Sequence, residues 1–374
     1  SLTWTPNAAP QTASRRRQTA LGCPGEDRSF SWVHPNGYAL TWTICELEDG
    51  SGFTLRSEFK NGSAEKVRLQ HFILCRTPRD AFVCAGDPAS WCLGTTSYYS
   101  RRIGNLERVL PSEEKLTHQG AYLGRIPYST RDPRRKDGHW RAFRDVITLY
   151  TDSSQRGLTM GAVGPPVSDV TFNVRVDRGR MLLEILGTMN DILVEPGETR
   201  ESDQVLVLVR PYREAVQTMF RWIAETHGSR TQRGALFGWL SWYGPYTGIT
   251  ADIVGRVAKA VGKHRDRIPM QVIQMDDLWQ VDRGDWRAHP GRFPDGMKVV
   301  ADAIRQAGAI PGIWMAVMNT YDRKPKHWYQ GKPRKDGAGY IDPTHPEGEK
   351  FIRESVRRMY QDGYRYYKFD FNHI

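Results

Sequence analysis

The chain has 374 residues, of which 39% are hydrophobic and 25% are charged, a balance typical of a folded globular protein with room for two domains. No apolar run reaches the ~18 residues of a membrane-spanning helix, so the sequence predicts no membrane contact. Much of the net charge of +11 lies in short clusters at 14–17, 101–102 and 131–137, which we interpret as solvated loops because no nucleic-acid-binding module accompanies them.

The five cysteines all fall in the first quarter of the chain: Cys23, Cys45, Cys75, Cys84 and Cys92. None belongs to a CxxC pair, so their spacing does not favour a zinc site. Their odd number leaves at least one thiol unpaired, and one or two disulfides are compatible with an exported protein. The first residues show neither an initiator methionine nor a secretory signal, which leaves the compartment open between the cytoplasm and an exported form with its signal removed.

The first half of the chain reads as short strands separated by turn residues. Strands are predicted at 37–47, 52–59, 67–75, 145–152, 169–176, 181–186 and 203–210. Many strands without helices favour an antiparallel β-sandwich over residues 1–211. A helix at 213–228, ended by Gly228, follows and gives a helical linker over 212–234.

After residue 235 strands and helices alternate, which indicates a parallel sheet built of βα units. Strands are predicted at 236–242, 270–277, 310–317 and 364–371, and helices at 250–262, 296–308 and 346–363. Polar residues gather where these strands end, and the first turn is no GxGxxG motif, so a TIM-type (β/α)8 barrel is favoured over a doubly wound sheet. Residues 235–374 would supply only about the first four βα units, and we expect further chain or a partner to supply the rest.

Two strand ends carry charges that a buried strand would normally avoid. Side chains alternate along a strand, so Lys368 and Asp370 share one face and the aromatic residues between and around them share the other. A lysine beside an aspartate favours the ionised carboxylate that a covalent nucleophile requires, although a simple buried ion pair would look the same. By the same alternation Gln274 and Asp276 point inward, and Asp277 follows at the strand end.

An acid pair beside an indole suits a ligand with many hydroxyls and an apolar face, as sugars have. Asp276 and Asp277 stand next to Trp279 in this way. Taken one at a time these signals are weak, because an acid pair also caps helices and Trp242 or Trp314 could be ordinary core. Their convergence on one end of four strands is what indicates a sugar site.

The motifs that carry this chemistry also occur in a recognisable order: GWLSWY (238–243), QMDDLWQ (274–280), GDW (284–286), RFPDGMK (292–298), GIW (312–314), DPTHPE (342–347) and YYKFDF (366–371). Together they resemble the melibiase-type α-galactosidases of glycoside hydrolase family 36 and, more distantly, family 27. The similarity spans roughly 235–374, and the β-rich half fits the N-terminal β-domain of that family by its pattern.

The resemblance implies a role for each matching residue. Asp370 corresponds to the catalytic nucleophile, and Lys368 to a lysine that contacts the sugar. The remaining sugar contacts fall on the acid pair that binds the O4 and O6 hydroxyls and on three tryptophans that form or support the walls of the subsite: Asp276, Asp277, Trp242, Trp314 and Trp279. No metal or organic cofactor is implied.

The sequence departs from the family at the mouth of the site, where Leu278 replaces the glycine of DDGWQ and MAVM (315–318) replaces a segment that leads to a proline. The acid/base carboxyl of the family comes near the end of the sixth barrel strand, beyond residue 374. The resemblance therefore assigns that role to none of the nearby acids: Asp285, Asp322, Asp336 and Asp342.

The function implied is a retaining glycoside hydrolase that removes terminal α-galactosyl units from melibiose- or raffinose-type oligosaccharides. The alternatives are a galactose-binding pseudoenzyme, an α-N-acetylgalactosaminidase and a galactosyl transferase of the same fold. The expected partner is an oligosaccharide with a terminal α-galactose rather than a nucleic acid or a membrane. Because family members often assemble, a homo-oligomer is an expectation from the resemblance alone.

Overall fold

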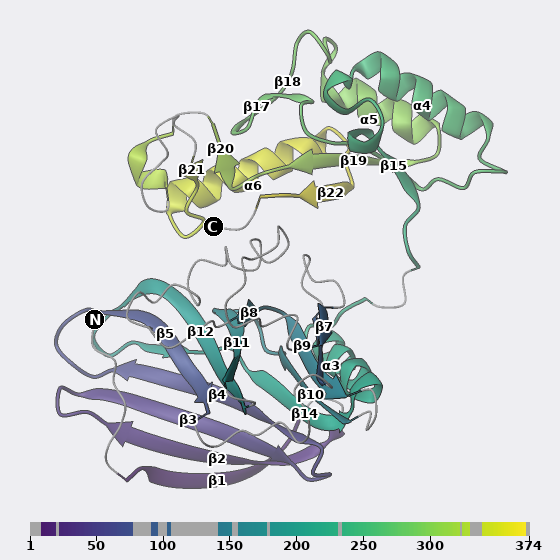
Figure 1. Ribbon diagram of the computed structural model, residues 1–374. Coiled ribbons are helices and arrows are strands. Elements are labelled where there is room, and N and C mark those ends of the chain that lie inside the picture. Colours follow the sequence, from purple (N-terminus) through teal and green to yellow (C-terminus); the bar gives the residue numbers. More distant parts are fainter. Residues whose placement is uncertain are drawn as a thin grey trace. The chain divides into compact units, whose positions relative to one another are not determined.

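The computed structural model describes residues 9–19, 22–77, 91–95, 103–105, 141–151, 156–177, 180–230, 234–321, 324–329 and 339–371. The chain divides into two compact units, Ser1–Gln232 and Arg233–Ile374, coloured purple to teal and green to yellow in Figure 1. Within the described ranges, no helix is both long and apolar enough to cross a membrane.

The first unit is built from two antiparallel sheets. The larger sheet has the strand order β1-β2-β3-β4-β14-β10-β9-β6-β7, with β13 paired to β4, and the smaller has the order β5-β12-β11-β8. Their bounds are β1 Gln11–Gln18, β2 Pro24–Val33, β3 Tyr38–Leu47, β4 Gly52–Asn61, β5 Val67–Arg76, β6 Trp91–Thr95, β7 Ile103–Asn105, β8 Arg141–Phe143, β9 Val146–Thr151, β10 Arg156–Ala162, β11 Asp169–Asp177, β12 Arg180–Val194, β13 Thr199–Glu201 and β14 Val205–Pro211.

One hydrophobic core lies between these two sheets. Leu55 and Val207 of the larger sheet pack in the same buried cluster as Phe72, Phe172 and Ile185 of the smaller sheet. This core exists because each strand turns its apolar face inward, as the alternating sequence predicts. The first unit is therefore an antiparallel β-sandwich.

The sequence did not predict the first two strands. The basic cluster at 14–17, predicted to be a loop, lies in β1, where Arg15 faces Asp27 and Arg16 faces Glu26 on β2. Opposite charges on paired strands allow a strand with no apolar stripe. The clusters at 101–102 and 131–137 and Cys84 lie outside the described residues. Within the described part of the chain, Cys23 and Cys75 are free thiols.

The helix predicted as a linker instead belongs to the first unit. Helix α3 (Tyr212–Thr226) buries Ala215, Met219 and Trp222 against Leu206 and Leu208 of β14. Its apolar residues recur at helical spacing and match the outer face of the larger sheet. Tertiary packing thus gives the apolar face of this helix, predicted as part of a linker over 212–234, a partner in the first unit.

The second unit contains a parallel four-stranded sheet with the order β15-β16-β19-β22 (Figure 1). Its elements are β15 Gly238–Leu240, α4 Ala251–Lys263, β16 Val272–Met275, β17 Gln280–Asp282, β18 Asp285–Ala288, α5 Gly296–Gln306, β19 Ile310–Met315, β20 Asn319–Thr320, β21 Gly339–Tyr340, α6 Pro346–Gln361 and β22 Tyr366–Phe369. Strands β17 and β18 form one antiparallel hairpin, and β20 pairs with β21.

The three helices pack on the outer face of this sheet, and their side chains share one core with the outward residues of the strands. Ile273 and Ile313 lie in this core with Val254 of α4, Val300 of α5 and Met359 of α6. The opposite face carries Gln274 on β16 beside Gly312 on β19, where an added Cβ would lie only 2.9 Å from the Cβ of Gln274. Gln274 therefore lies on the face of the sheet opposite the helices.

Candidate functional site

All seven residues predicted to form a site lie at the carboxyl end of the parallel sheet. Asp276 and Asp277 directly follow β16, and Asp370 directly follows β22. The others lie near the ends of strands or just beyond them: Trp242, Trp279, Trp314 and Lys368. Because neighbouring parallel strands end on the same side, these residues form one edge of the sheet.

Asp276 is the residue that joins the strand ends together. Its side chain is only 3% exposed, and its Oδ2 accepts hydrogen bonds from Lys368 Nζ and Gln274 Nε2, each over 2.9 Å. Its backbone N–H donates to Ser241 Oγ over 2.8 Å. Asp276 thus contacts residues that follow β15 and residues of β22 from its own place after β16, and its buried charge is compensated.

Lys368 is the cationic partner on the edge strand β22. Burial alone would lower its pKa, but the hydrogen bond to Asp276 and the charges of Asp276 and Asp370 outweigh burial and raise the pKa above the ordinary value of 10.5. The ammonium group therefore stays charged at neutral pH and links Asp276 electrostatically to Asp370.

Asp277 is held by a second cation that the sequence reasoning missed. Its Oδ1 accepts hydrogen bonds from the Leu278 backbone N–H and from Gln280 Nε2, over 2.8 and 2.7 Å. Its Oδ2 pairs with Arg283 Nη2 over 2.7 Å. Leu278 has a φ of +79°, a left-handed conformation that glycine adopts without strain. Leu278 therefore occupies a position whose backbone conformation favours the glycine that the family motif has there.

Asp370 is fixed through both its backbone and its side chain. Its backbone N–H donates to the carbonyl of Met315 over 3.0 Å, which continues the ladder between β19 and β22. Trp314 Nε1 donates to Oδ2 over 3.1 Å, and the Phe371 N–H donates to Oδ1 over 2.9 Å. Asp370 stays half-buried, so an oriented carboxylate remains accessible at this edge.

The three tryptophans differ in exposure. Trp279 is fully buried and donates from Nε1 to the carbonyl of Trp314 over 2.8 Å, so it supports the site from below. Trp314 is 1% exposed, and the guanidinium carbon of Arg283 lies 5.4 Å from the centre of its ring. Protein atoms therefore cover the Trp314 ring, and its role as a wall of the sugar subsite stays a prediction. Trp242 is half-buried and packs against Tyr246 with ring centres 4.2 Å apart.

The strand alternation fails at Phe371. Phe371 was expected on the outer face with Tyr367 and Phe369, but its φ of +50° turns the chain after β22 ends. Its ring meets that of Trp314 edge-on with centres 6.2 Å apart. Phe371 therefore belongs to the site, and a change of backbone conformation just after a strand carries no signal in the sequence period.

One group of described side chains has spacing that could hold a metal ion: His327, His345 and Glu347. Their atoms already have partners, since His327 Nε2 lies 2.9 Å from Glu347 Oε2 and His345 Nδ1 accepts from the Glu347 N–H over 3.3 Å. His345 and Glu347 also stand at the N-terminus of α6, whose partial positive charge disfavours a cation. We interpret the group as a helix cap with an exposed hydrogen bond between His327 and Glu347.

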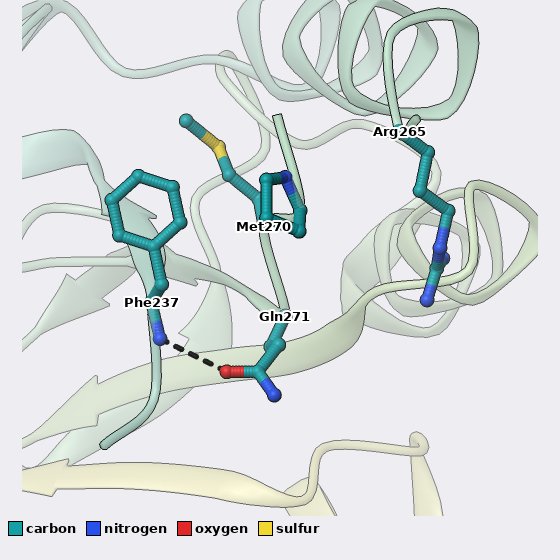
Figure 2. Close-up of a pocket in the computed structure, with 5 residues that line it drawn as sticks. Phe237, Arg265, Met270 and Gln271 are labelled. Atoms are coloured by element: carbon teal, nitrogen blue, oxygen red, sulfur yellow. Dashed lines mark hydrogen bonds between the residues drawn. The ribbon is translucent and has the colours of Figure 1, made fainter. Parts of the chain in front are cut away.

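The second unit also has a small hollow at the opposite end of its sheet (Figure 2). Phe237, Met270 and Gln271 line it just before β15 and β16 begin, and the Phe237 N–H donates to Gln271 Oε1 over 3.1 Å. Arg265 reaches the same hollow from the segment after α4. It lies where the strands start, whereas the carboxylates lie where they end, so the two features are separate.

The fold has clear counterparts among solved structures, although no family model matches the chain. It is similar to the fold of α-galactosidases of glycoside hydrolase family 36, over 98% of this chain and about half the length of the proteins that it matches. Because 98% of this chain is covered, the similarity includes residues of both units.

Particular examples come from two bacteria. The α-galactosidase from Lactobacillus brevis shares 13% of residues with this chain at a TM-score of 0.63, with 98% of this chain and 49% of that chain covered. AgaA, a family 36 α-galactosidase from Geobacillus stearothermophilus, shares 14% at a TM-score of 0.60, with coverage of 98% and 51%. Variants of AgaA have been solved in complex with stachyose and with raffinose.

Proposed function

We propose that the second unit is the first half of a (β/α)8 barrel and that the whole protein is a retaining α-galactosidase. The observation that carries this proposal is the grouping of Asp276, Asp277, Lys368 and an oriented Asp370 at one carboxyl edge of a parallel sheet. Active sites of barrel enzymes are built at this edge. Similarity to the fold of known α-galactosidases supports the same reaction class.

The proposed mechanism is a double displacement. Asp370 attacks C1 of the terminal galactosyl unit, and the leaving oxygen departs with a proton from a second carboxylic acid. Water then attacks C1, gives its proton to that second carboxylate, and releases Asp370. The second carboxyl group must stand about 5–5.5 Å from the nucleophile, and we assign this role to none of the acids named above.

The substrate proposed is an oligosaccharide with a terminal α-galactosyl unit. Asp276 and Asp277 would accept hydrogen bonds from the ring hydroxyls, and Lys368 would donate to one, while Trp242 offers a partly open apolar ring. The stachyose and raffinose bound by AgaA variants are sugars of this class.

The decisive experiment replaces the proposed nucleophile in the intact gene product. Asp370→Gly should lower turnover of an aryl α-galactoside by at least about a thousandfold, and azide should restore release of the aryl group with formation of a β-galactosyl azide. Asp252→Asn, at an exposed acid on α4, is the matched control and should turn over normally. Undiminished turnover by Asp370→Gly would refute the assignment.

A galactose-binding pseudoenzyme is the second candidate. It needs only the proposed sugar contacts of Asp276, Asp277 and Lys368 and gives Asp370 no nucleophilic role. Binding of galactose by the intact protein, without hydrolysis or transfer of any α-galactoside, would establish it. Release of N-acetylgalactosamine, or transfer of galactose to a second sugar, would identify the other enzymes of the same fold.

A further inference from the structure

Arg283 is the most highly engaged cation at the carboxyl edge of the sheet, and the mechanism above gives it no role. It stands in the turn between β17 and β18, where Gly284 adopts a φ of +92°. We infer that Arg283 is a positioning residue that fixes the sugar-binding carboxylate of Asp277 relative to the nucleophile Asp370. This inference rests on the proposed function and adds a residue to the same site.

The polar contacts of Arg283 tie the hairpin to the site. Its side chain is 17% exposed, Nη2 pairs with Asp277 Oδ2 over 2.7 Å, and Nη1 donates to the Tyr321 hydroxyl over 3.2 Å. Its backbone carbonyl accepts from Thr320 Oγ1 over 3.2 Å and from the Tyr321 N–H over 2.9 Å. Both the backbone and the guanidinium of Arg283 are therefore fixed by hydrogen bonds, and these keep the guanidinium next to Asp277.

Three aromatic rings surround the same guanidinium, and we call them the aromatic cage: Trp314, Tyr321 and Phe371. The guanidinium carbon lies 4.4 Å from the ring centre of Phe371, 5.1 Å from that of Tyr321 and 5.4 Å from that of Trp314. Each lies within the range of a cation–π interaction, which gains strength when the cation is removed from water. The cage therefore stabilises a charge that would otherwise be costly to bury.

The cage connects Arg283 to both sides of Asp370. Trp314 donates its indole hydrogen bond to Asp370 Oδ2, and Phe371 donates its backbone N–H to Oδ1. Arg283 thus contacts the two residues that orient the nucleophile and also binds Asp277. A guanidinium suits this task because its planar fork can pair with a carboxylate and stack on rings at once, which an ammonium group cannot do.

Replacement of Arg283 should therefore change recognition of the sugar as well as the rate. In the intact gene product, Arg283→Met should lower kcat/KM for an aryl α-galactoside by about a hundredfold, with a clear rise in KM. The conservative Arg283→Lys should recover part of this loss. The matched control is Arg287→Met in the same hairpin, whose side chain is 72% exposed, and its constants should stay within about twofold of the wild type.

Substrates that lack one hydroxyl distinguish a positioning role of Arg283 from a purely structural role. If Arg283 acts through Asp277, Arg283→Met should lower kcat/KM for the galactoside by a factor at least ten times larger than for one of the two analogues, the 4-deoxy or the 6-deoxy galactoside. That analogue is the one that lacks the hydroxyl bound by Asp277. Equal penalties on all three substrates, or kinetic constants within threefold of the wild type, would overturn the inference. If Arg283→Met does not fold, the same comparison with Arg283→Lys decides, and wild-type selectivity in that variant would also overturn it.

The wild-type measurement tests a different statement. Absence of hydrolysis by the wild type would refute the proposed enzyme without bearing on Arg283. In that case the affinities of the wild type and of Arg283→Met for galactose and its deoxy analogues are measured by calorimetry. Equal affinities of the two proteins would overturn the inference.

Discussion

The indole N–H of Trp314 on β19 donates a hydrogen bond over 3.1 Å to Oδ2 of Asp370, which directly follows β22 and lies 56 positions later in the sequence. This bond helps to set the direction of a carboxylate whose other oxygen accepts from the Phe371 backbone N–H. An accurately directed nucleophile contributes strongly to rate, since small misplacements cost large factors.

Trp314→Phe should therefore lower kcat for an aryl α-galactoside by about ten- to a hundredfold through loss of this bond. Trp286→Phe is the matched control, because Trp286 is 1% exposed in the same cluster and the two ring centres are 6.3 Å apart. Among the residues that the structure describes, Trp286 Nε1 has no hydrogen-bond partner. Both changes remove similar buried volume, so equal losses of kcat would contradict a specific role for the Trp314 bond.

The ion pair between Lys368 and Asp276 should behave as a coupled unit. Lys368→Met leaves the buried carboxylate of Asp276 with Gln274 as its one side-chain donor among the described residues, and we expect a loss of about 2–3 kcal/mol in the free energy of unfolding. This is less than for a fully buried pair because Lys368 keeps some contact with water. The double variant Lys368→Met/Asp276→Asn should lose less than the sum of the two single variants in urea titrations, and strict additivity would contradict coupling.

The same pair should make stability depend on alkaline pH. Because the pKa of Lys368 is raised in the folded protein, the pair contributes fully below the ordinary pKa of 10.5 and its contribution is lost as pH rises through the raised pKa. The difference in unfolding free energy between the wild type and Lys368→Met should therefore shrink above pH 10.5. Burial raises the pKa of Tyr367 to about 12, and this titration should largely cancel in the comparison. A constant difference across that range would count against the assignment.

Leu278 should show an inverted preference between alanine and glycine. At ordinary positions alanine is the more stabilising of the two, but the φ of +79° at Leu278 penalises any side chain with a Cβ. Leu278→Gly should therefore be about 1 kcal/mol more stable than Leu278→Ala in chemical denaturation. The reverse order would show that the turn after Asp277 relaxes when the leucine is removed.

Much of the second unit could be predicted because its hydrophobic residues recur with the period of a strand or of a helix. The alternation around Ile273, Gln274 and Asp276 identifies the buried and polar faces of β16, and the helical spacing in α5 identifies its packing face. The placement of Asp276, Asp277, Lys368 and Asp370 at one edge then follows from parallel strands. The roles of these residues stay predictions.

What could not be predicted depends on contacts between distant segments. Arg283 lies in a hairpin turn whose approach to Asp277 and Phe371 is set by packing, and nothing in its neighbours along the chain distinguishes it from Arg287. Strand β12 runs from Arg180 to Val194, well beyond the predicted 181–186, because pairing with β5 carries it through polar residues and a register shift. Periodicity describes faces but not such tertiary partners.

The position of Asp276 has a consequence for the order in which the molecule folds. Its partners lie 35 residues earlier, at Ser241, and 92 residues later, at Lys368, so these contacts close only after long loops have been brought together. Pairing of β16 with β15 and β19, and of β19 with β22, brings these three distant segments side by side. The carboxylate cluster therefore depends on the assembled sheet and not on its neighbours along the chain.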